Sequence, residues 1–434
     1  MKHSLRRIVL PVLLTSALEQ GCELSTRPPT GVVLPGDLDG LDGLPTRLAA
    51  ATGDFAVAYG GNQTDDGLIL VSGLLADELR QTIGSSPNVN LDRRIAGTSN
   101  FLSEIVYRDL QRARASAEHA VDAYGNFDPT AVGALYARNL AGFAYVLLGE
   151  AFCSGVPISR VAADETVTYG QAETTAQVLE RAVVAFDSVL AAAPSVLAEP
   201  EVASDSVAAQ VDLARVGRAR ALLDLGRFAE AGDEGARVPS DFLWELDYSN
   251  NSPREVNGVH FHIWLQPEYS AADSEGVNGI GFVAAGDPRA RVDPAVFAPL
   301  EYRVPNAPIV LAGTTEARLI QAEALLQAGD AAASLALLNG LRAAVGLAPL
   351  DDPATPDGRV TQLFRERAFW LWLTGHRLGD LRRLVRQYHR SSGTVYPTGP
   401  YAGGPLMYEN ELDLSVYEVN NPRYDPAACD PRQP

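Results

Sequence analysis

Three helical segments of the chain share one pattern of apolar and small residues. The segments GFAYVLLG, ARALLDLG and AEALLQAG align on Gly149, Gly226 and Gly329. Each segment has a small residue seven positions before that glycine, namely Gly142, Ala219 and Ala322. Small residues at these positions let paired helices approach closely, as in tetratricopeptide hairpins. Because the spacing between the copies is irregular, the pattern predicts a scaffold of helix hairpins interrupted by long insertions.

The remaining sequence also favours helices over strands. Apolar residues recur with helical spacing over residues 101–124 and 174–192. Short strands are expected over residues 259–265 and 303–311. We therefore predict an all-α, mainly helical fold, a tetratricopeptide-like helix-hairpin scaffold with long loop-rich insertions and a few short strands.

Changes in composition divide the chain into an N-terminal leader and one domain. Residues 1–22 have the pattern of an export signal, and residues 23–37, rich in Pro, Gly and Thr, are expected to form a tether. Residues 38–434 are expected to form a single helical domain. Within it, residues 240–308 form a loop-rich excursion, and residues 390–434 an irregular C-terminal tail.

The leader ends at a cysteine in the position of a lipoprotein cleavage site. Positive residues begin it, a short apolar run follows, and Gly21 and Cys22 come next. The apolar run is too short to span a bilayer as a stable anchor. We predict that Cys22 is lipidated and anchors the domain to a membrane. Because Glu19 occupies a position that is normally aliphatic, an ordinary signal peptide followed by a chance cysteine remains the alternative.

The charge of the chain excludes several function classes. The formal net charge is −19, which argues against a nucleic-acid-binding surface, since such a surface needs a basic field. Lys2 is the only lysine. A mature chain without lysine has no P-loop lysine, Schiff-base lysine or S-x-x-K catalytic pair.

Two cysteines remain if Cys22 is lipidated. In an oxidising envelope, Cys153 and Cys429 are candidates for a disulfide that ties the tail to the first half of the domain. The alternative is two independent thiols, one buried and one on a mobile tail.

Local motifs for catalysis and cofactors are weak. His260 and His262 would share one face of a strand, but no third ligand stands at motif spacing, so no metal site is expected. Gly279 and Gly281 fit a G-x-G-x-x-A pattern in what reads as a loop, because Gly286-Asp-Pro soon follows. The chain is therefore expected to be neither an enzyme nor a cofactor-binding protein.

Residues 366–383, ERAFWLWLTGHRLGDLRR, predict a buried corner between two short helices. Gly375 permits the break between them, and Asp380 would cap the second helix. Arg377 would then pair with Glu366 or Asp380, because its planar fork can satisfy carboxylates at a corner. We expect this cluster to have a structural role.

The same stretch resembles the C-terminal signature of SusD/RagB-like proteins, which are nutrient-collecting outer-membrane lipoproteins. The matching residues are Glu366, Arg367, Leu371, Gly375, Arg377, Asp380, Leu381 and Arg383. Trp370 and Thr374 replace two glutamates of that signature, which indicates a divergent branch. Further similarities lie in AYVLLGEAFCSGVPI, in Asp287-Pro-Arg289 and in residues 317–347. The ordered set covers most of the chain.

The resemblance implies a function in nutrient uptake. Such a protein would sit at the outer membrane, lipid-anchored and exposed at the cell surface. It would bind an extracellular oligosaccharide, or else a peptide, and deliver it to a TonB-dependent, SusC-like transporter. The alternative is a tetratricopeptide-like scaffold for protein–protein interactions in the cell envelope.

Aromatic side chains of the excursion are candidates for the ligand site. Sugar rings pack their C–H faces on Trp or Tyr, while neighbouring polar groups bind the hydroxyls. The candidate residues, together with two from the early loop, are Trp244, Tyr248, Trp264, Tyr269, Asn90 and Arg93. The competing interpretation is that these aromatics fasten loops to the helical scaffold.

Overall fold

The computed structural model describes residues 38, 40–162, 166–430 and 432. The leader, Cys22 and the tether lie outside the described residues. The described part of the chain is mainly helical, which confirms the predicted all-α fold class. The helices are α1 (Gly40–Gly60), α2 (Leu68–Ala76), α3 (Ser86–Asp92), α4 (Phe101–Phe127), α5 (Val132–Ala151), α6 (Thr175–Leu197), α7 (Ser204–Asp224), α8 (Phe228–Arg237), α9 (Gly258–His260), α10 (Thr314–Gln327), α11 (Ala331–Ala344), α12 (Pro356–Trp370), α13 (Arg377–Arg386) and α14 (Ser392–Val395), with a π-helix at Phe261–Leu265 and a 3₁₀ turn at Pro426–Ala428.

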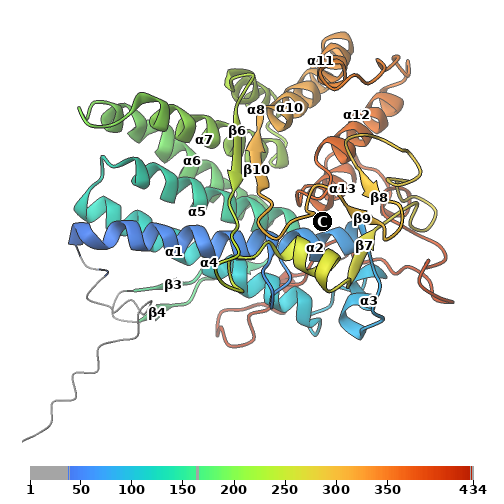
Figure 1. Cartoon of the computed structure of the whole chain (residues 1–434), viewed down its shortest axis with the longest axis horizontal. Coiled ribbons are helices and arrows are strands. Elements are labelled where there is room, and N and C mark those ends of the chain that lie inside the picture. Colours follow the sequence, from blue (N-terminus) through green and yellow to red (C-terminus); the bar gives the residue numbers. More distant parts are fainter. Residues whose placement is uncertain (1–37, 39, 163–165, 431, 433–434) are drawn as a thin grey trace, which may run out of the picture.

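Long helices stack side by side to form the scaffold (Figure 1). Helix α1 packs on α4, α4 on α5, α5 on α6, and the series continues through α7, α8, α10 and α11. The predicted small residues lie at these contacts. A Cβ atom at Gly142 would come within 2.6 Å of the Phe186 ring on α6, so this pair of helices requires glycine there. Ala219 and Ala322 are fully buried.

One of the described helices, α5, is long and apolar enough to cross a membrane by length and composition. Most of its apolar window is buried, and it packs between α4, α6 and α7. This helix is therefore the central core helix of the scaffold.

Strands in the described residues form five two-stranded antiparallel pairs. The pairs are β1 (Leu79–Gln81) with β7 (Tyr269–Ala271), β2 (Val156–Pro157) with β5 (Ala172–Glu173), β3 (Arg160–Val161) with β4 (Val167–Thr168), β6 (Leu243–Leu246) with β10 (Ile309–Gly313), and β8 (Val292–Asp293) with β9 (Ala298–Pro299). The β6–β10 pair joins the two ends of the excursion, and β10 packs against α7.

The predicted strand over residues 259–265 is wrong. This segment is α9 followed by the π-helix. Asn257 caps its start, because its side chain accepts the backbone N–H of His260. Both histidines are buried: the His260 ring lies against the Tyr302 carbonyl, and the His262 ring lies against the Asn62 carbonyl. A short run of alternating residues suits either a strand or a buried helix, and here the tertiary partners decide.

A disulfide joins Cys153, just after α5, to Cys429 near the end of the tail, with the Cα atoms 5.1 Å apart. The tail also runs beside the end of α5, where the Cys153 N–H donates to the Leu414 carbonyl. These contacts hold the tail against the scaffold.

Mass analysis tests this bond. In the unreduced, unfolded protein, Cys153 and Cys429 should resist alkylation, and a peptide pair containing both should be recovered after digestion. Reduction should expose both thiols. Two thiols that react without reduction would contradict the assignment.

The corner is buried as predicted, but its predicted ion pairs are wrong. Arg377 binds Asp77 at the end of α2, with its Nε 2.9 Å from Oδ1 and its Nη2 3.1 Å from Oδ2. Glu366 instead accepts from Arg289 at 2.6 Å and from Arg342 at 2.7 Å. The partners come from distant segments, which local spacing does not show.

The predicted cap is also wrong. Helix α13 begins at Arg377, with His376 at the N-cap position, and Asp380 lies inside the helix. There Asp380 accepts from Arg367 and Arg383, each at 2.8 Å. Trp370, which replaces a glutamate of the signature, also has a partner: the Arg289 guanidinium lies 5.0 Å from the centre of the indole ring. Gly375, at φ +70°, makes the predicted break between α12 and α13.

Candidate functional site

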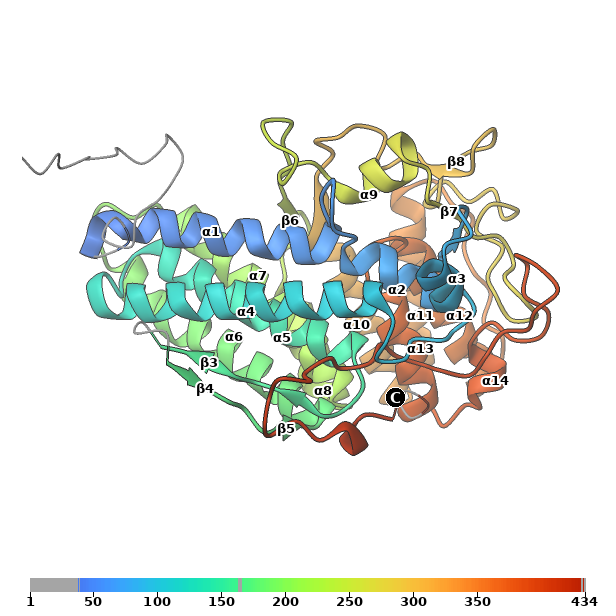
Figure 2. The ribbon, with the colours of Figure 1, turned by 90° about the horizontal axis from the view of Figure 1, so that it is seen from below.

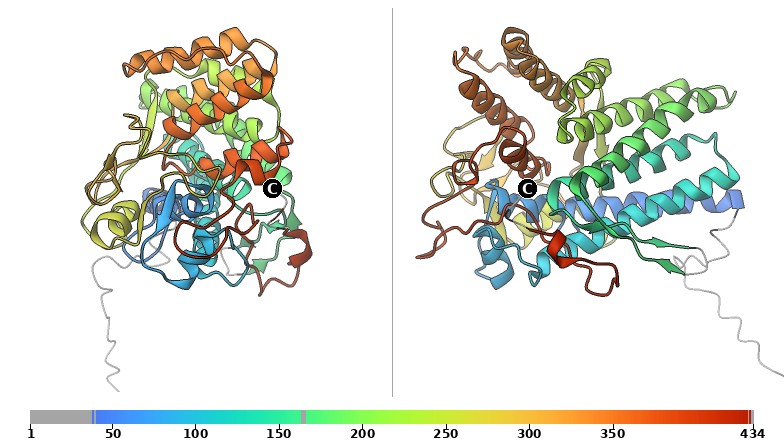
Figure 3. Two further views of the ribbon diagram at one scale, coloured as in Figure 1. Left: turned by 90° about the vertical axis from the view of Figure 1, so that its right-hand side faces the viewer. Right: turned by 180° about the vertical axis from the view of Figure 1, so that it is seen from behind.

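Three segments that are distant in sequence meet at one end of the molecule (Figure 2). They are β1 with α3, the excursion from α9 to β9, and the tail beyond α14, all of which face the viewer in the left panel of Figure 3. Between them lies a cavity of about 240 Å³, which we call the junction pocket. It is lined by Arg80, Gln81, Thr82, Asp92, Glu275, Tyr401, Ala402 and Gly403.

Hydrogen bonds fix the polar groups of the junction pocket. Asp92 accepts from the Gln81 backbone N–H and from the Tyr401 hydroxyl, each at 2.9 Å. The Gln81 amide also donates to the Tyr401 oxygen at 3.1 Å. Glu275 accepts from the Tyr408 hydroxyl. Neighbouring groups therefore hold both carboxyl groups in place.

Burial changes the titration of these carboxyl groups. It raises the pKa of Asp92 from 3.8 to about 7; the Gln81 hydrogen bond opposes this rise and the charge of Glu275 adds to it. Burial also raises the pKa of Glu275, opposed by the hydrogen bond from Tyr408. Two carboxyl groups with raised pKa values in one pocket favour the neutral forms at mildly acid pH.

The raised pKa of Asp92 predicts that the contribution of this residue to folding stability falls as the pH rises. Because the pKa of Asp92 is higher in the folded state, its contribution is fully present below about pH 4 and is lost as the pH rises through about 7. In the wild-type protein, the titration of Asp92 lowers the free energy of unfolding between pH 5 and pH 8. In Asp92→Asn this decrease should be smaller than in wild type by on the order of 1 kcal/mol. Urea unfolding at both pH values measures it, and an unchanged pH dependence would contradict the prediction.

An exposed aromatic ring lies next to the junction pocket. Phe297 is 38% exposed, in the turn between β8 and β9. The guanidinium of Arg80, a residue that lines the pocket, lies 5.8 Å from the centre of this ring. Arg80 is itself held by a hydrogen bond from its Nε to the Ser270 hydroxyl at 3.1 Å. An apolar face beside fixed polar groups is the combination that sugar recognition uses.

The backbone of Phe297 is strained. Its φ is +54°, in the left-handed region that favours glycine, and its N–H and carbonyl are bonded to Asp293 and Ala271. Keeping a bulky side chain in this conformation costs free energy, and such strain is often found at functional positions. The ring is thereby presented to solvent rather than folded into the core.

The residues predicted from the sequence are not brought together. Trp264 donates its indole N–H to the Pro299 carbonyl and lies under Arg303. Tyr269 is buried, between Asp66 and Asn88. None of the six predicted residues lines the pockets described here.

The other predicted residues fasten loops. The Trp244 ring packs on Tyr136 of α5, 5.2 Å between centres, and the Tyr248 hydroxyl donates to the Ala56 carbonyl on α1. Arg93 holds the tail through Glu409 and the Met407 carbonyl, and Asn90 is half-buried. These contacts favour the interpretation that the aromatics fasten the excursion to the scaffold.

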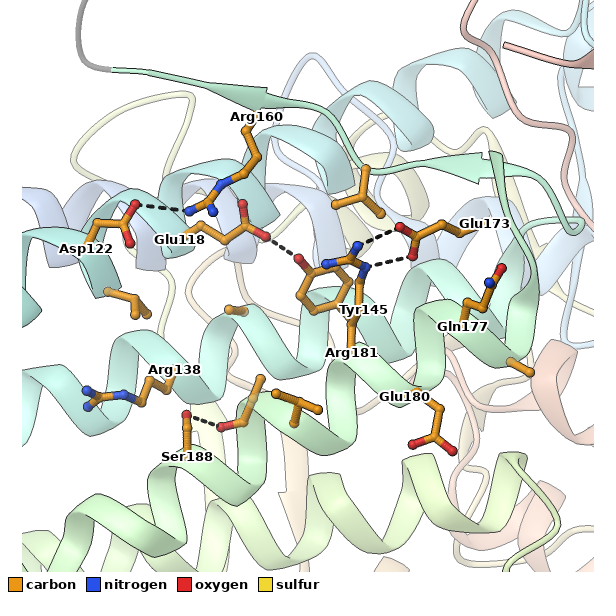
Figure 4. Close-up of a pocket in the computed structure, with 16 residues that line it drawn as sticks. Glu118, Asp122, Arg138, Tyr145, Arg160, Glu173, Gln177, Glu180, Arg181 and Ser188 are labelled. Carbon is orange, nitrogen blue, oxygen red and sulfur yellow. Dashed lines mark hydrogen bonds and ion pairs between the residues drawn. The ribbon is translucent and has the colours of Figure 1, made fainter. Parts of the chain in front are cut away.

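A second, larger cavity lies between α4, α5, α6 and the β3–β4 hairpin, and we call it the helical groove (Figure 4). Its volume is about 750 Å³. Several of its charged groups are paired: Arg181 binds Glu173 through two bonds of 2.6 and 2.7 Å, and Arg160 binds Asp122 at 3.2 Å. The Tyr145 hydroxyl donates to Glu118. A ligand in the groove would have to compete with these existing bonds.

Comparison with known proteins gives a family match over part of the chain and a set of similar folds. Residues 306–424 match the model of the SusD family. No curated protein matches the sequence. Similar solved structures include a SusD-like carbohydrate-binding protein from Bacteroides vulgatus, with a TM-score of 0.60 at 14% identity over 88% of this chain and 92% of that one.

Two further solved structures have a similar fold. A SusD/RagB family protein from Bacteroides thetaiotaomicron has a TM-score of 0.60, and a SusD-like carbohydrate-binding protein from Bacteroides fragilis has one of 0.59. Both are 14% identical, over 88% of this chain and 96% of the other. At this identity, the structures show a shared fold, and the family match covers the C-terminal part that holds the corner. The chain therefore shares the fold of these SusD-like structures, and its residues 306–424 match the SusD family model.

Proposed function

We propose that this protein captures an oligosaccharide outside the cell and passes it to a TonB-dependent, SusC-like outer-membrane transporter. It acts without covalent chemistry, held at the outer-membrane surface by a lipid on Cys22. The family match and the description of two structural neighbours as carbohydrate-binding support a carbohydrate ligand.

The observation that carries this proposal is the exposed ring of Phe297 beside the junction pocket. The ring supplies an apolar face of the size of one pyranose, and Arg80 covers part of it. Arg80 and Gln81 at the pocket supply donors, and Asp92 and Glu275 supply acceptors for hydroxyl groups. The arrangement favours a neutral polyhydroxylated ligand over an anionic one, because the pocket already contains two carboxyl groups.

Two experiments test the proposal. A glycan array probed beside a peptide library should give binding to one class of glycan. Purification of the lipidated protein from solubilised outer membranes should recover a large β-barrel transporter. A protein that ignores all glycans and peptides but retains a protein partner would favour the alternative, a tetratricopeptide-like interaction scaffold.

A further inference from the structure

Asp66, His262 and Glu268 meet where the loop after α1 contacts the excursion, close to β7. One ligand atom from each residue lies within 4.8 Å of the others. Asp66 follows α1 in the early part of the chain, His262 lies on the π-helix, and Glu268 immediately precedes β7. Asp66 and His262 are buried, and 27% of the Glu268 side chain is exposed, which leaves a path from solvent.

The hydrogen bonds of His262 indicate which of its two ring nitrogens carries the proton. Its Nε2 lies 3.0 Å from the Asn62 carbonyl, which only accepts, so the N–H of the neutral ring is on Nε2. The lone pair of Nδ1 then faces two carboxylates, with Glu268 Oε2 at 3.1 Å and Asp66 Oδ1 at 3.7 Å. With a neutral ring, the Nδ1 lone pair and the Glu268 oxygen repel each other unless a positive species lies between them, and Asp66 Oδ1, which accepts from the Tyr269 hydroxyl, lies beside them.

We propose that this species is a divalent cation of the zinc class, bound by His262 Nδ1 and one oxygen each of Asp66 and Glu268. With metal–ligand bonds of about 2.0 Å, tetrahedral geometry places ligand atoms roughly 3.3 Å apart. The two observed distances lie on either side of this value. Two carboxylates also cancel the charge of one divalent cation, and a nitrogen ligand favours zinc over calcium, which takes six to eight oxygens.

Residues around the cluster hold these groups in position. The Asn62 carbonyl orients the imidazole, and the Asn62 side chain is fixed by the N–H groups of Thr64 and Asp65 at 2.6 and 2.9 Å. The Tyr269 hydroxyl donates to Asp66 at 3.0 Å. Such outer hydrogen bonds are typical of metal sites. Among the described residues, His262 is the one basic side chain paired with Asp66 or Glu268.

The proposed metal site is connected to the junction pocket through the backbone. Thr82, which lines the junction pocket, donates its N–H to the Glu268 carbonyl, and β1 pairs with β7 directly beyond it. A bound cation would therefore stiffen the wall of that pocket. The metal site itself does not depend on the proposed carbohydrate ligand.

Calorimetric titration of chelator-treated protein, purified without a polyhistidine tag, tests the proposal with Zn²⁺ alone. We expect one equivalent to bind, a higher melting temperature, and no comparable effect of Ca²⁺. Glu268→Gln should weaken zinc binding at least tenfold and His262→Gln should abolish it, whereas His119→Gln, an exposed histidine on α4, should leave it unchanged. Because Glu268 is partly exposed, its variant keeps the test valid if His262→Gln fails to fold.

Three outcomes would overturn the proposal. The first is the absence of zinc binding by the wild-type protein. The second is equal affinity in Glu268→Gln. The third is an NMR spectrum in which His262 carries protons on both nitrogens at neutral pH and does not respond to zinc, since a proton would then bridge the carboxylates instead.

Discussion

Replacing Arg377 by methionine should lower the free energy of unfolding by roughly 3–5 kcal/mol, because it leaves the buried charge of Asp77 without a partner. Asp77 is fully buried, and its backbone, at φ +152°, is strained. Its carboxylate also accepts the Ile280 N–H at 3.2 Å, so the pair links α2, α13 and the excursion. A loss of this pair therefore affects three segments at once.

Urea unfolding of four proteins measures this effect. Wild type, Arg377→Met, Asp77→Asn and the double variant form a double-mutant cycle, which gives the coupling energy of the pair. Arg365→Met is a matched control, since Arg365 lies on the exposed side of α12. The folded fraction of Arg377→Met should keep its ligand affinity. Unchanged stability would contradict the structural role of the pair, and lost affinity in a stable protein would place Arg377 in the ligand site.

Replacing Phe297 by alanine should reduce oligosaccharide affinity about 10- to 100-fold, since buried aromatic contacts dominate binding at such sites. The fold should be retained, because the ring is exposed and its backbone bonds to Asp293 and Ala271 do not involve the side chain. Phe297→Trp should preserve binding, because indole offers a larger apolar face.

Calorimetry with the glycan found on the array measures the affinity of each variant. Phe127→Ala is the matched control, an exposed phenylalanine at the far end of α4 that should have no effect. If Phe297→Ala bound with wild-type affinity, the ring would have no part in recognition.

The helical scaffold could be predicted from the sequence because it depends on local patterns. The repeat placed Gly142, Ala219 and Ala322 at positions that are buried in the structure, and the dense apolar run after Glu366 indicated a buried corner. A glycine break at Gly375 was likewise a local signal. Periodicity and turn chemistry act within a few residues, and both are visible in one sequence.

The candidate site could not be predicted in the same way, because its contacts join distant segments. The Tyr401 hydroxyl reaches Asp92 across 309 positions, and Arg377 reaches Asp77 across 300. Phe297 gave no signal beyond being one aromatic residue in a loop. Its importance depends on its exposure, its positive φ and its contact with Arg80, all of which are set by the three-dimensional structure.

The aromatic residues of the excursion could not be assigned to a ligand site from the sequence, because their contacts also join distant segments. Trp244, Tyr248 and Tyr269 stand in the loop-rich excursion, where a ligand platform was expected. In the structure, their polar atoms or rings have partners within the protein, and Tyr269 has no exposed face. A large aromatic side chain that fastens a loop and one that binds a sugar have the same local sequence signature.

A crystal structure of the protein with its captured oligosaccharide would locate the ligand site. We expect a sugar ring stacked on Phe297, with hydroxyl groups within hydrogen-bond distance of Arg80, Gln81 or Glu275. A ligand seated instead in the helical groove between α4, α5 and α6, with the junction pocket empty, would contradict this expectation.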